Sequence, residues 1–316
     1  MSTLLPLVVI VGPTAVGKTF VGIELAKRIA GEVISGDSMQ VYKHLNIGTA
    51  KPSREEINGI PHYMIDIANP DEEFNVAIFQ KQVEYYVKFI NDRKKLPVLV
   101  GGTGLYVRSV IDHYDFSPPG ENPDKRAELL ELVRLKGNEF LVELLTKNDP
   151  VAAARIHPND TRRLIRALEV FYTTGRPISD FQYNSVKKIS KYNLAYFGLN
   201  MNRQDLYKRI EQRVDIMISR GLVDEVKSLL EMGYGLHNPS MQALGYKELV
   251  DYLNNVCSLE EAVETIKRNT RRFAKRQLTW FRRDERIRWK DVEKYSSLME
   301  IADEIVMEVE GQFSIT

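Results

Sequence analysis

The chain has 316 residues, a formal net charge of +1, and 43% hydrophobic and 28% charged residues, which is the composition of an ordinary globular protein with a full core. Its single cysteine, Cys257, excludes an intrachain disulfide and a cysteine-based metal cluster, and its five histidines are scattered without metal-ligand spacing. The sequence has no apolar run of membrane-spanning length and lacks the features of a secretory signal at its start, so we expect a cytoplasmic protein without a membrane partner.

The first predicted elements are a buried strand over residues 7–11 and a helix over residues 19–30. Between them lies the G-x-x-x-x-G-K-T sequence of a phosphate-binding loop (the P-loop): Gly12, Pro13, Thr14, Ala15, Val16, Gly17, Lys18 and Thr19. Glycines let backbone N–H groups converge on an anion, and the helix dipole points at the same place. Lys18 adds a positive charge and the Thr19 hydroxyl can bind Mg²⁺, whereas Pro13 has no N–H to donate.

A second predicted strand, over residues 32–35, runs directly into Gly36 and Asp37. In a parallel sheet the carboxyl end of this strand lies at the same edge as the P-loop. A carboxylate there could bind Mg²⁺ through water or accept a proton from a nucleophile beside the phosphates. Asp37 could equally be a turn residue whose carboxylate accepts hydrogen bonds from neighbouring backbone N–H groups. The sequence leaves both readings open.

A helix over residues 74–89 and a strand over residues 95–100 come next, and the strand ends in Gly101-Gly102-Thr103-Gly104. Many P-loop ATPases place an acidic residue at the end of a core strand to organise Mg²⁺, and this strand has none. Glycines allow a ligand to approach the backbone closely, and Thr103 offers a neutral donor and acceptor. The pattern favours an uncharged, flat ligand, with a plain strand-to-helix turn as the alternative.

The middle of the chain changes character at the break Ser117-Pro118-Pro119-Gly120 and is helical and charged until about residue 179. Asp160 or Thr161 caps a predicted helix there, and a fourth buried strand follows over residues 194–199. We therefore predict an α/β fold: a P-loop-containing parallel sheet flanked by helices, with an inserted all-helical domain. The predicted core covers residues 1–115 and 191–316, and the insertion covers residues 116–190.

The last part of the chain contains an amphipathic helix over residues 205–219 and then a basic segment, residues 266–290, with eleven lysines and arginines. Five of these repeat at helical spacing: Arg268, Arg271, Arg272, Lys275 and Arg276. Phe273, Trp280, Phe281 and Trp289 are interleaved with them. The segment is typical either of a polyanion-binding surface or of a solvated helix face whose aromatic side chains lie in the core.

Taken together, these motifs resemble those of the tRNA dimethylallyltransferases, enzymes that prenylate N6 of the adenosine just 3′ of the anticodon. The resemblance covers nearly the whole chain, with every block in the family's order. It rests on the P-loop, on residues 35–42, 101–106, 163–170, 207–217 and 275–281, and on Gly48-Thr49-Ala50-Lys51-Pro52 and Gly245-Tyr246.

The resemblance implies that the P-loop binds the diphosphate of dimethylallyl diphosphate rather than a nucleotide, with Mg²⁺ on Thr19. Lys18 and Arg213 would neutralise the departing pyrophosphate, Asp37 would accept a proton from the adenine amine, and Thr103 would help to hold the adenine. The other implied partner is the anticodon stem-loop of a tRNA, and we expect a monomer. We treat the insertion as a clamp on the anticodon stem, with Arg126 as our own candidate contact. The full set of residues expected to contact tRNA is Asp37, Ser38, Met39, Gln40, Thr103, Arg126, Arg162, Arg163, Leu164, Ile165 and Arg166.

Two other functions use the same features. A P-loop kinase of small molecules or nucleosides would use Lys18, Thr19 and Asp37 equally well, although it has no need of the glycine-rich turn at Thr103 or of the basic segment. An RNA-binding protein that senses a nucleotide would use the P-loop and the basic segment and would modify nothing.

Overall fold

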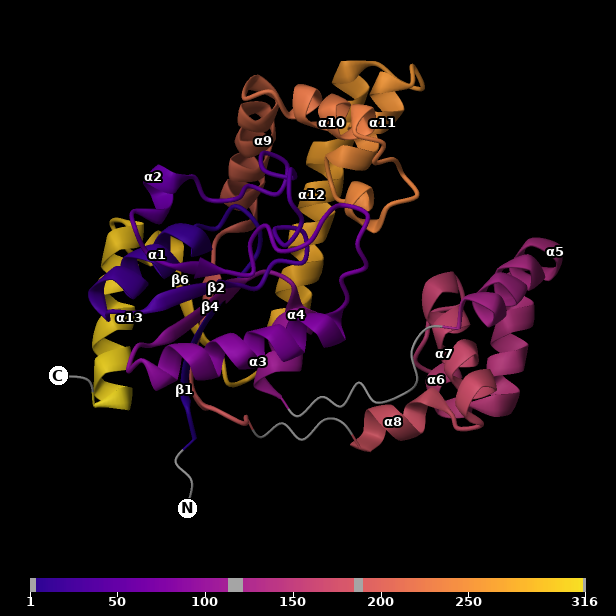
Figure 1. Ribbon diagram of the computed structural model, residues 1–316, viewed down its shortest axis with the longest axis horizontal. Coiled ribbons are helices and arrows are strands. Elements are labelled where there is room, and N and C mark those ends of the chain that lie inside the picture. The colour runs from indigo at the N-terminus through magenta and orange to yellow at the C-terminus, as the bar shows by residue number, and fades with distance from the viewer. Residues whose placement is uncertain (1–3, 113–121, 185–189, 315–316) are drawn as a thin grey trace. The chain divides into compact units, whose positions relative to one another are not determined.

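The computed structural model describes residues 4–112, 122–184 and 190–314 and divides into two compact units, Met1–Ile111 with Lys191–Thr316 and Asp112–Ser190 (Figure 1). The first unit is an α/β structure and the second is helical, which confirms the predicted fold class. The predicted break at residues 117–120 and the boundary between residues 115 and 116 lie outside the described residues.

A six-stranded parallel sheet forms the centre of the described part of the first unit, with strand order β3-β2-β4-β1-β5-β6. Four of these strands are the predicted ones, and β3 and β6 were not predicted. The strands are β1 (Pro6–Val11), β2 (Glu32–Ser35), β3 (His62–Tyr63), β4 (Pro97–Gly101), β5 (Asn193–Asn200) and β6 (Arg288–Asp291).

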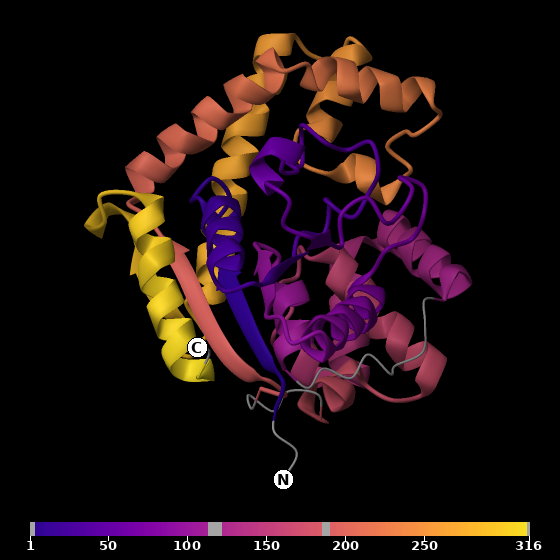
Figure 2. The ribbon, with the colours of Figure 1, turned by 60° about the vertical axis from the view of Figure 1, so that its left-hand side comes forward.

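The sheet is buried on both faces, as its apolar strands require. Alternate residues of β1 point to opposite sides, so that Val8 packs in one core with α1 (Lys18–Arg28) and α13 (Leu298–Phe313). Val9 packs in a second core with α3 (Val76–Asp92) and α4 (Gly104–Ile111). Figure 2 shows α13 lying beside the neighbouring strands β1 and β5. The sheet is thus held rigidly between two helical layers.

Strand β6 was missed because its sequence, Arg-Trp-Lys-Asp, has no apolar run. Arg288 and Lys290 extend from this edge strand to α13, where Arg288 Nη1 lies 2.7 Å from a carboxylate oxygen of Glu308 and Lys290 pairs with Glu304. These ion pairs neutralise the cations, so two members of the basic segment contribute to folding rather than to a free surface.

A helical layer covers the loop that follows β2 (Figure 1). Val41, Tyr42 and Leu45 of this loop are buried in one apolar core with the four helices α9 to α12. The layer therefore fixes residues 36–52 against the C-terminal half of the unit. Its helices are α9 (Arg203–Ser219), α10 (Leu222–Glu231), α11 (Tyr246–Leu253) and α12 (Leu259–Phe281), and the short η1 (Pro239–Gln242) packs against α11. The other short elements of this unit are α2 (Arg54–Ile57), which contacts α1, and η2 (Val292–Lys294), which follows β6.

The second unit has its own core, built from leucines such as Leu129, Leu141 and Leu168. Asp160 caps α7, because its side chain accepts a hydrogen bond from the N–H of Arg163. The described helices of this unit are α5 (Pro123–Asn148), interrupted at Gly137, α6 (Pro150–Ala153), α7 (Thr161–Thr174) and α8 (Ile178–Asn184). In neither unit does a described helix combine the length and the apolar character needed to cross a bilayer.

Candidate active site

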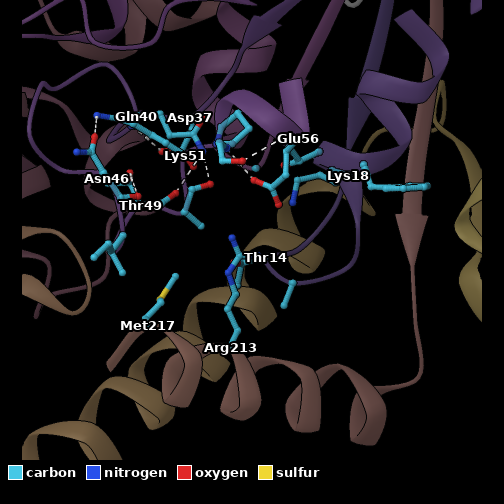
Figure 3. A pocket seen from close by; sticks show the side chains of 18 of the residues that line it. Thr14, Lys18, Asp37, Gln40, Asn46, Thr49, Lys51, Glu56, Arg213 and Met217 are labelled. Atoms are coloured by element: carbon cyan, nitrogen blue, oxygen red, sulfur yellow. Dashed lines mark hydrogen bonds between the residues drawn. The ribbon is translucent and has the colours of Figure 1, made fainter. Parts of the chain in front are cut away.

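An open cavity of about 1050 Å³ lies in the first unit where β1, β2 and β4 end. This is the sheet edge at which open α/β sheets bind their ligands. Figure 3 shows side chains from the P-loop, the turn after β2, the loop before α2 and helix α9 pointing into it. Eight of the predicted site residues line this cavity: Thr14, Ala15, Gly17, Lys18, Thr19, Asp37, Gln40 and Arg213.

The P-loop has the backbone conformation that its sequence predicts. Gly12 has φ +150°, and a Cβ there would lie 2.6 Å from the carbonyl oxygen of Leu199, so only glycine fits. Gly17 has φ +107° and precedes the first residue of α1. The loop therefore delivers Lys18 and Thr19 to the N-terminal end of a helix, where the dipole favours an anion.

Lys18 bends back over the loop and donates a hydrogen bond from Nζ to the carbonyl oxygen of Pro13, 2.6 Å away. Burial lowers the pKa of Lys18 from its usual value to about 7; the Arg213 cation acts in the same direction and the Asp37 carboxylate opposes both. A bound diphosphate would replace the missing counter-charge, so the site favours an anion close to Lys18.

Arg213 extends from α9 into the cavity and supplies a second cation (Figure 3). Burial lowers its pKa from the usual value, while the carboxylates of Asp37 and Glu56 raise it. A guanidinium keeps its charge under such conditions because its intrinsic pKa is so high. The cavity thus combines two cations from distant parts of the sequence.

Asp37 is held by a turn of its own backbone. Its Oδ1 accepts hydrogen bonds from the N–H groups of Met39, at 2.8 Å, and Gln40, at 3.3 Å. Its Oδ2 forms no hydrogen bond with any described residue. The prediction that Asp37 is a turn residue is therefore correct for Oδ1. Oδ2 is free to contact a ligand in the cavity that Lys18 and Arg213 also line.

Thr103 lies beside the Asp37 turn but does not itself line the cavity. Its hydroxyl oxygen accepts a hydrogen bond from the N–H of Ser38 at 3.3 Å and lies 3.4 Å from the Ser38 hydroxyl. The turns that follow β2 and β4 are therefore linked directly through these two residues.

The loop opposite the P-loop depends on Glu225 of α10. Its carboxylate accepts hydrogen bonds from the N–H groups of Asn46, Ile47 and Gly48 and from the hydroxyl of Tyr246, the last at 2.6 Å. Gln40 adds hydrogen bonds from Nε2 to the carbonyl oxygens of Thr49 and Ala50, both at 3.2 Å. Residues 46–50, which line the cavity in part, are thus anchored to α10 and α11.

Several residues of the cavity carried no predicted role. Gln277 connects the P-loop to the turn after β4, Glu56 raises the pKa of Arg213, and Lys51 donates a hydrogen bond to the carbonyl oxygen of Tyr42. Lys51 and Gln277 lie in blocks that carry the family resemblance, and Glu56 completes a Ser53-x-x-Glu56 capping box. The family blocks and the capping box therefore single out these residues in the sequence, but they do not indicate which contacts the residues make.

The remaining predicted tRNA contacts lie in the second unit. Arg126 and Arg166 pair with the buried Glu169, with nitrogen–oxygen distances of 3.0 and 2.9 Å. Arg162 and Arg163 are exposed on α7. Leu164 and Ile165, in contrast, are buried among the core side chains of this unit, so their side chains are not available to an RNA.

Nine of the eleven cations of the basic segment fall into two groups, and the other two, Arg282 and Arg283, are exposed just after α12. Lys267, Arg271, Arg286, Arg288 and Lys290 form ion pairs within the chain. The α12 basic face, defined as Arg268, Arg272, Lys275 and Arg276, is exposed and forms no ion pair with a described residue. Three of the four aromatic side chains of this segment belong to the core, because Phe281 is buried and Trp280 and Trp289 pack against the same core. Phe273 lines the cavity.

The donor set of the cavity fits Mg²⁺ bound together with a diphosphate. The Thr19 hydroxyl is exposed in the cavity and forms no hydrogen bond with a described residue. Across the described part of the chain, no group of three or more His, Cys, Asp or Glu side chains could hold a metal by itself. Mg²⁺ typically binds through few protein ligands, substrate phosphates and water, which this arrangement permits.

The parallel sheet, the P-loop sequence and the two cations at one sheet edge are the features of an α/β protein of the P-loop class. A family model described as IPP transferase matches residues 40–284. The chain belongs to the IPP transferase family.

Named relatives agree with this assignment. The chain is 54% identical to the tRNA dimethylallyltransferase of Carboxydothermus hydrogenoformans, with 96% of each chain covered. It is similar in structure to the full-length tRNA isopentenylpyrophosphate transferase of Bacillus halodurans, with a TM-score of 0.71, 47% identity and 98% of each chain covered. A eukaryotic dimethylallyltransferase acting on tRNA gives a TM-score of 0.76 at 33% identity, over 90% of this chain and 73% of the other. These relatives favour the transferase over the kinase.

Proposed function

We propose that this protein transfers the dimethylallyl group from dimethylallyl diphosphate to N6 of the adenosine just 3′ of the anticodon of a tRNA and releases pyrophosphate. The observation that supports this most directly is that Asp37 shares one cavity with the P-loop, Lys18 and Arg213. On this proposal Asp37 acts as the base beside a diphosphate held by the P-loop, and a prenyl transfer to an amine requires the two groups to be adjacent.

On the donor side, the P-loop N–H groups and Lys18 bind the diphosphate, and Arg213 approaches it from α9. During the reaction the bond between the allylic carbon and the diphosphate oxygen breaks, and its electron pair leaves with pyrophosphate. The two cations stabilise the charge that develops on that oxygen. Mg²⁺, held by Thr19 and the diphosphate, would supply further neutralisation of this charge.

On the acceptor side, N6 of adenine forms the new bond to the allylic carbon, and the proton it loses goes to Asp37. The Oδ2 oxygen is the candidate acceptor because Oδ1 is already engaged by two backbone N–H groups. An aromatic amine is a weak nucleophile, so its alignment with the allylic carbon matters as much as the base. Thr103, adjacent to the Asp37 turn, would help to hold the adenine.

The target base must leave its stack to enter the cavity, and its unstacking cost is offset by contacts to its edge and face. We assign part of the electrostatic attraction for the RNA backbone to the α12 basic face. In the second unit, Arg162 and Arg163 are the exposed candidates for contacts with the anticodon stem. The proposal includes a cytoplasmic location, where the tRNA substrate is available.

We also propose a monomer, because every residue that lines the cavity comes from the first unit of a single chain. Light scattering of the free protein measures this directly, and a stable dimer would contradict it.

The function is tested by the intact mass of an unmodified anticodon stem-loop after incubation with the protein, Mg²⁺ and dimethylallyl diphosphate. We expect a gain of one prenyl group, and no gain when the target adenosine is replaced by guanosine. A parallel reaction with ATP distinguishes the alternatives. Consumption of ATP without prenylation would favour a kinase, and binding of RNA without any change in its mass would favour a nucleotide sensor.

A further inference from the structure

Gln277 of α12 connects two loops that the proposed reaction must hold in register. Its Oε1 accepts a hydrogen bond from the N–H of Thr14 in the P-loop, at 2.9 Å. Its Nε2 donates a hydrogen bond to the carbonyl oxygen of Gly102 in the turn after β4, also at 2.9 Å. The side chain is only 7% exposed, so both of its polar groups are used within the protein.

The two loops joined by Gln277 have different tasks in the proposed function. Thr14 belongs to the loop that binds the diphosphate, and Gly102 directly precedes Thr103, which is linked to the Asp37 turn through Ser38. The strands before them, β1 and β4, are neighbours, with Val11 paired to Gly101. Beyond these strand ends the loops are no longer held by the sheet ladder, and the Gln277 amide joins them there.

The contact is tight enough to require both a glycine and an amide. A Cβ added to Gly102 would lie 2.3 Å from Nε2 of Gln277. The carbonyl oxygen of Gly102 needs a donor, and the N–H of Thr14 needs an acceptor. Among side chains of this length, only a primary amide supplies both without a charge.

We infer that Gln277 is a positioning residue for prenyl transfer, which sets the distance between the diphosphate loop and the turn that carries the adenine-binding residues. This inference rests on the proposed function, because it assigns the two loops to the two substrates. Displacement of reacting groups by about 1 Å can cost about 100-fold in rate, so a role of this kind changes turnover more than the binding of either substrate.

Gln277→Glu tests the donor half of the contact with almost no change in shape. An ionised carboxylate still accepts from Thr14 but cannot donate to Gly102, and it repels that carbonyl oxygen. We expect kcat to fall about 10- to 100-fold near neutral pH, with the dissociation constants for dimethylallyl diphosphate and the stem-loop changed by less than about 3-fold.

The pH dependence distinguishes positioning from a general loss of structure. Burial raises the pKa of such a carboxyl, and the protonated form regains an O–H that can donate to Gly102. The activity of Gln277→Glu relative to the unchanged protein should therefore rise as the pH falls from about 8 to about 5.5. The exposed Gln204→Glu on α9 is the matched control and should show a ratio near one at every pH.

Gly102→Ala approaches the same contact from the opposite loop. Its Cβ would displace the Gln277 amide, so we expect a loss of kcat with both dissociation constants retained and with a melting transition still present. Unchanged kcat in both variants, or a Gln277→Glu ratio that does not depend on pH, would overturn the inference. If the unchanged protein itself fails to prenylate the stem-loop, the proposed function fails, and that result is separate from either variant.

Discussion

The two sides of the cavity are built in different ways. One side is the P-loop, residues 12–19, of which six lie between β1 and α1 and the last two, Lys18 and Thr19, begin α1. The other side is assembled from residues 46–57, α9 and α12, which come from three distant parts of the chain. The first side is shaped mainly by local backbone conformation, whereas the second depends on long-range anchors such as Glu225. Gln277 of α12 adds one long-range contact to the first side, through the N–H of Thr14.

Because the two sides are built differently, substitutions of substrate-contacting groups and substitutions of distant anchors should have different effects. Changes in the groups that meet the substrates should reduce the chemical step directly. Changes in the distant anchors should reduce it through displaced loops and should also lower stability.

Removal of the proposed base should have the largest effect. We expect Asp37→Ala to reduce turnover by about 100- to 10,000-fold, because the N6 proton loses its acceptor, while the affinity for tRNA stays nearly constant. Single-turnover rates and a separate RNA-binding titration measure the two quantities. The exposed Asp71→Ala is the control that should leave both unchanged. An unchanged rate for Asp37→Ala would remove Asp37 as the base.

Disruption of the Glu225 anchor should have a smaller effect on rate and a clear effect on stability. In Gly48→Ala the new Cβ would lie 2.4 Å from the ring of Tyr246, so the loop or the ring must move. We expect a loss of about 1–3 kcal/mol in the free energy of unfolding and about 10-fold in kcat. Chemical denaturation and turnover assays measure these changes.

Gly311→Ala on α13 is the matched control for Gly48→Ala, because a Cβ there meets open space. It should raise stability by up to about 1 kcal/mol through helix propensity and leave kcat unchanged. A Gly48→Ala protein with unchanged stability and rate would show that this side of the cavity does not need its distant anchor.

The α12 basic face should contribute to RNA affinity in a salt-dependent manner. We expect Arg272→Ala with Lys275→Ala to weaken binding of the stem-loop and to lower the salt slope by about one for each phosphate contact removed. Arg271→Ala is the comparison on the same helix, because Arg271 already pairs with Glu211 and should change the slope less. Equal salt slopes for the unchanged protein and both variants would show that this face is a solvated helix surface that does not contact the RNA.

The affinity for the donor should show a modest pH dependence that arises from Lys18. Its pKa in the free protein is about 7, and a bound diphosphate raises it by stabilising the ammonium. The affinity for the donor should therefore be highest below pH 7, where Lys18 is already protonated, and should fall as the pH rises above that value. Above pH 7, binding of the donor should be accompanied by uptake of a proton by Lys18. Calorimetry in buffers of different ionisation enthalpy measures the uptake, and its absence above pH 7 would contradict the shift.

The sequence predicts the local parts of this molecule well. β1, β4 and β5 each contain an apolar run and β2 has the pair Val33-Ile34, and all four strands are found close to the predicted positions. β3 has only two residues, and β6 carries charges that become neutral only when α13 packs beside it. Neither feature has a signature that a local pattern can reveal.

The same division applies to the site. Asp37 comes two residues after β2, and Lys18 begins α1 at the end of the loop that follows β1. Their shared position at one sheet edge therefore follows from the parallel arrangement of β1 and β2 in the sheet. The contacts of Gln277 span 263 residues to Thr14 and 175 residues to Gly102, and nothing in the sequence near Gln277 indicates either partner. The basic segment could not be resolved from sequence, because its ion pairs depend on α9 and α13.

The most direct test of the account is the ratio of pyrophosphate released to prenyl groups gained when the stem-loop is added to the protein already loaded with dimethylallyl diphosphate and Mg²⁺. The account predicts equal amounts of both products and almost no pyrophosphate before the RNA is added. Release of pyrophosphate without a matching gain in RNA mass would contradict it, because the diphosphate site and the base would then not act on one transfer.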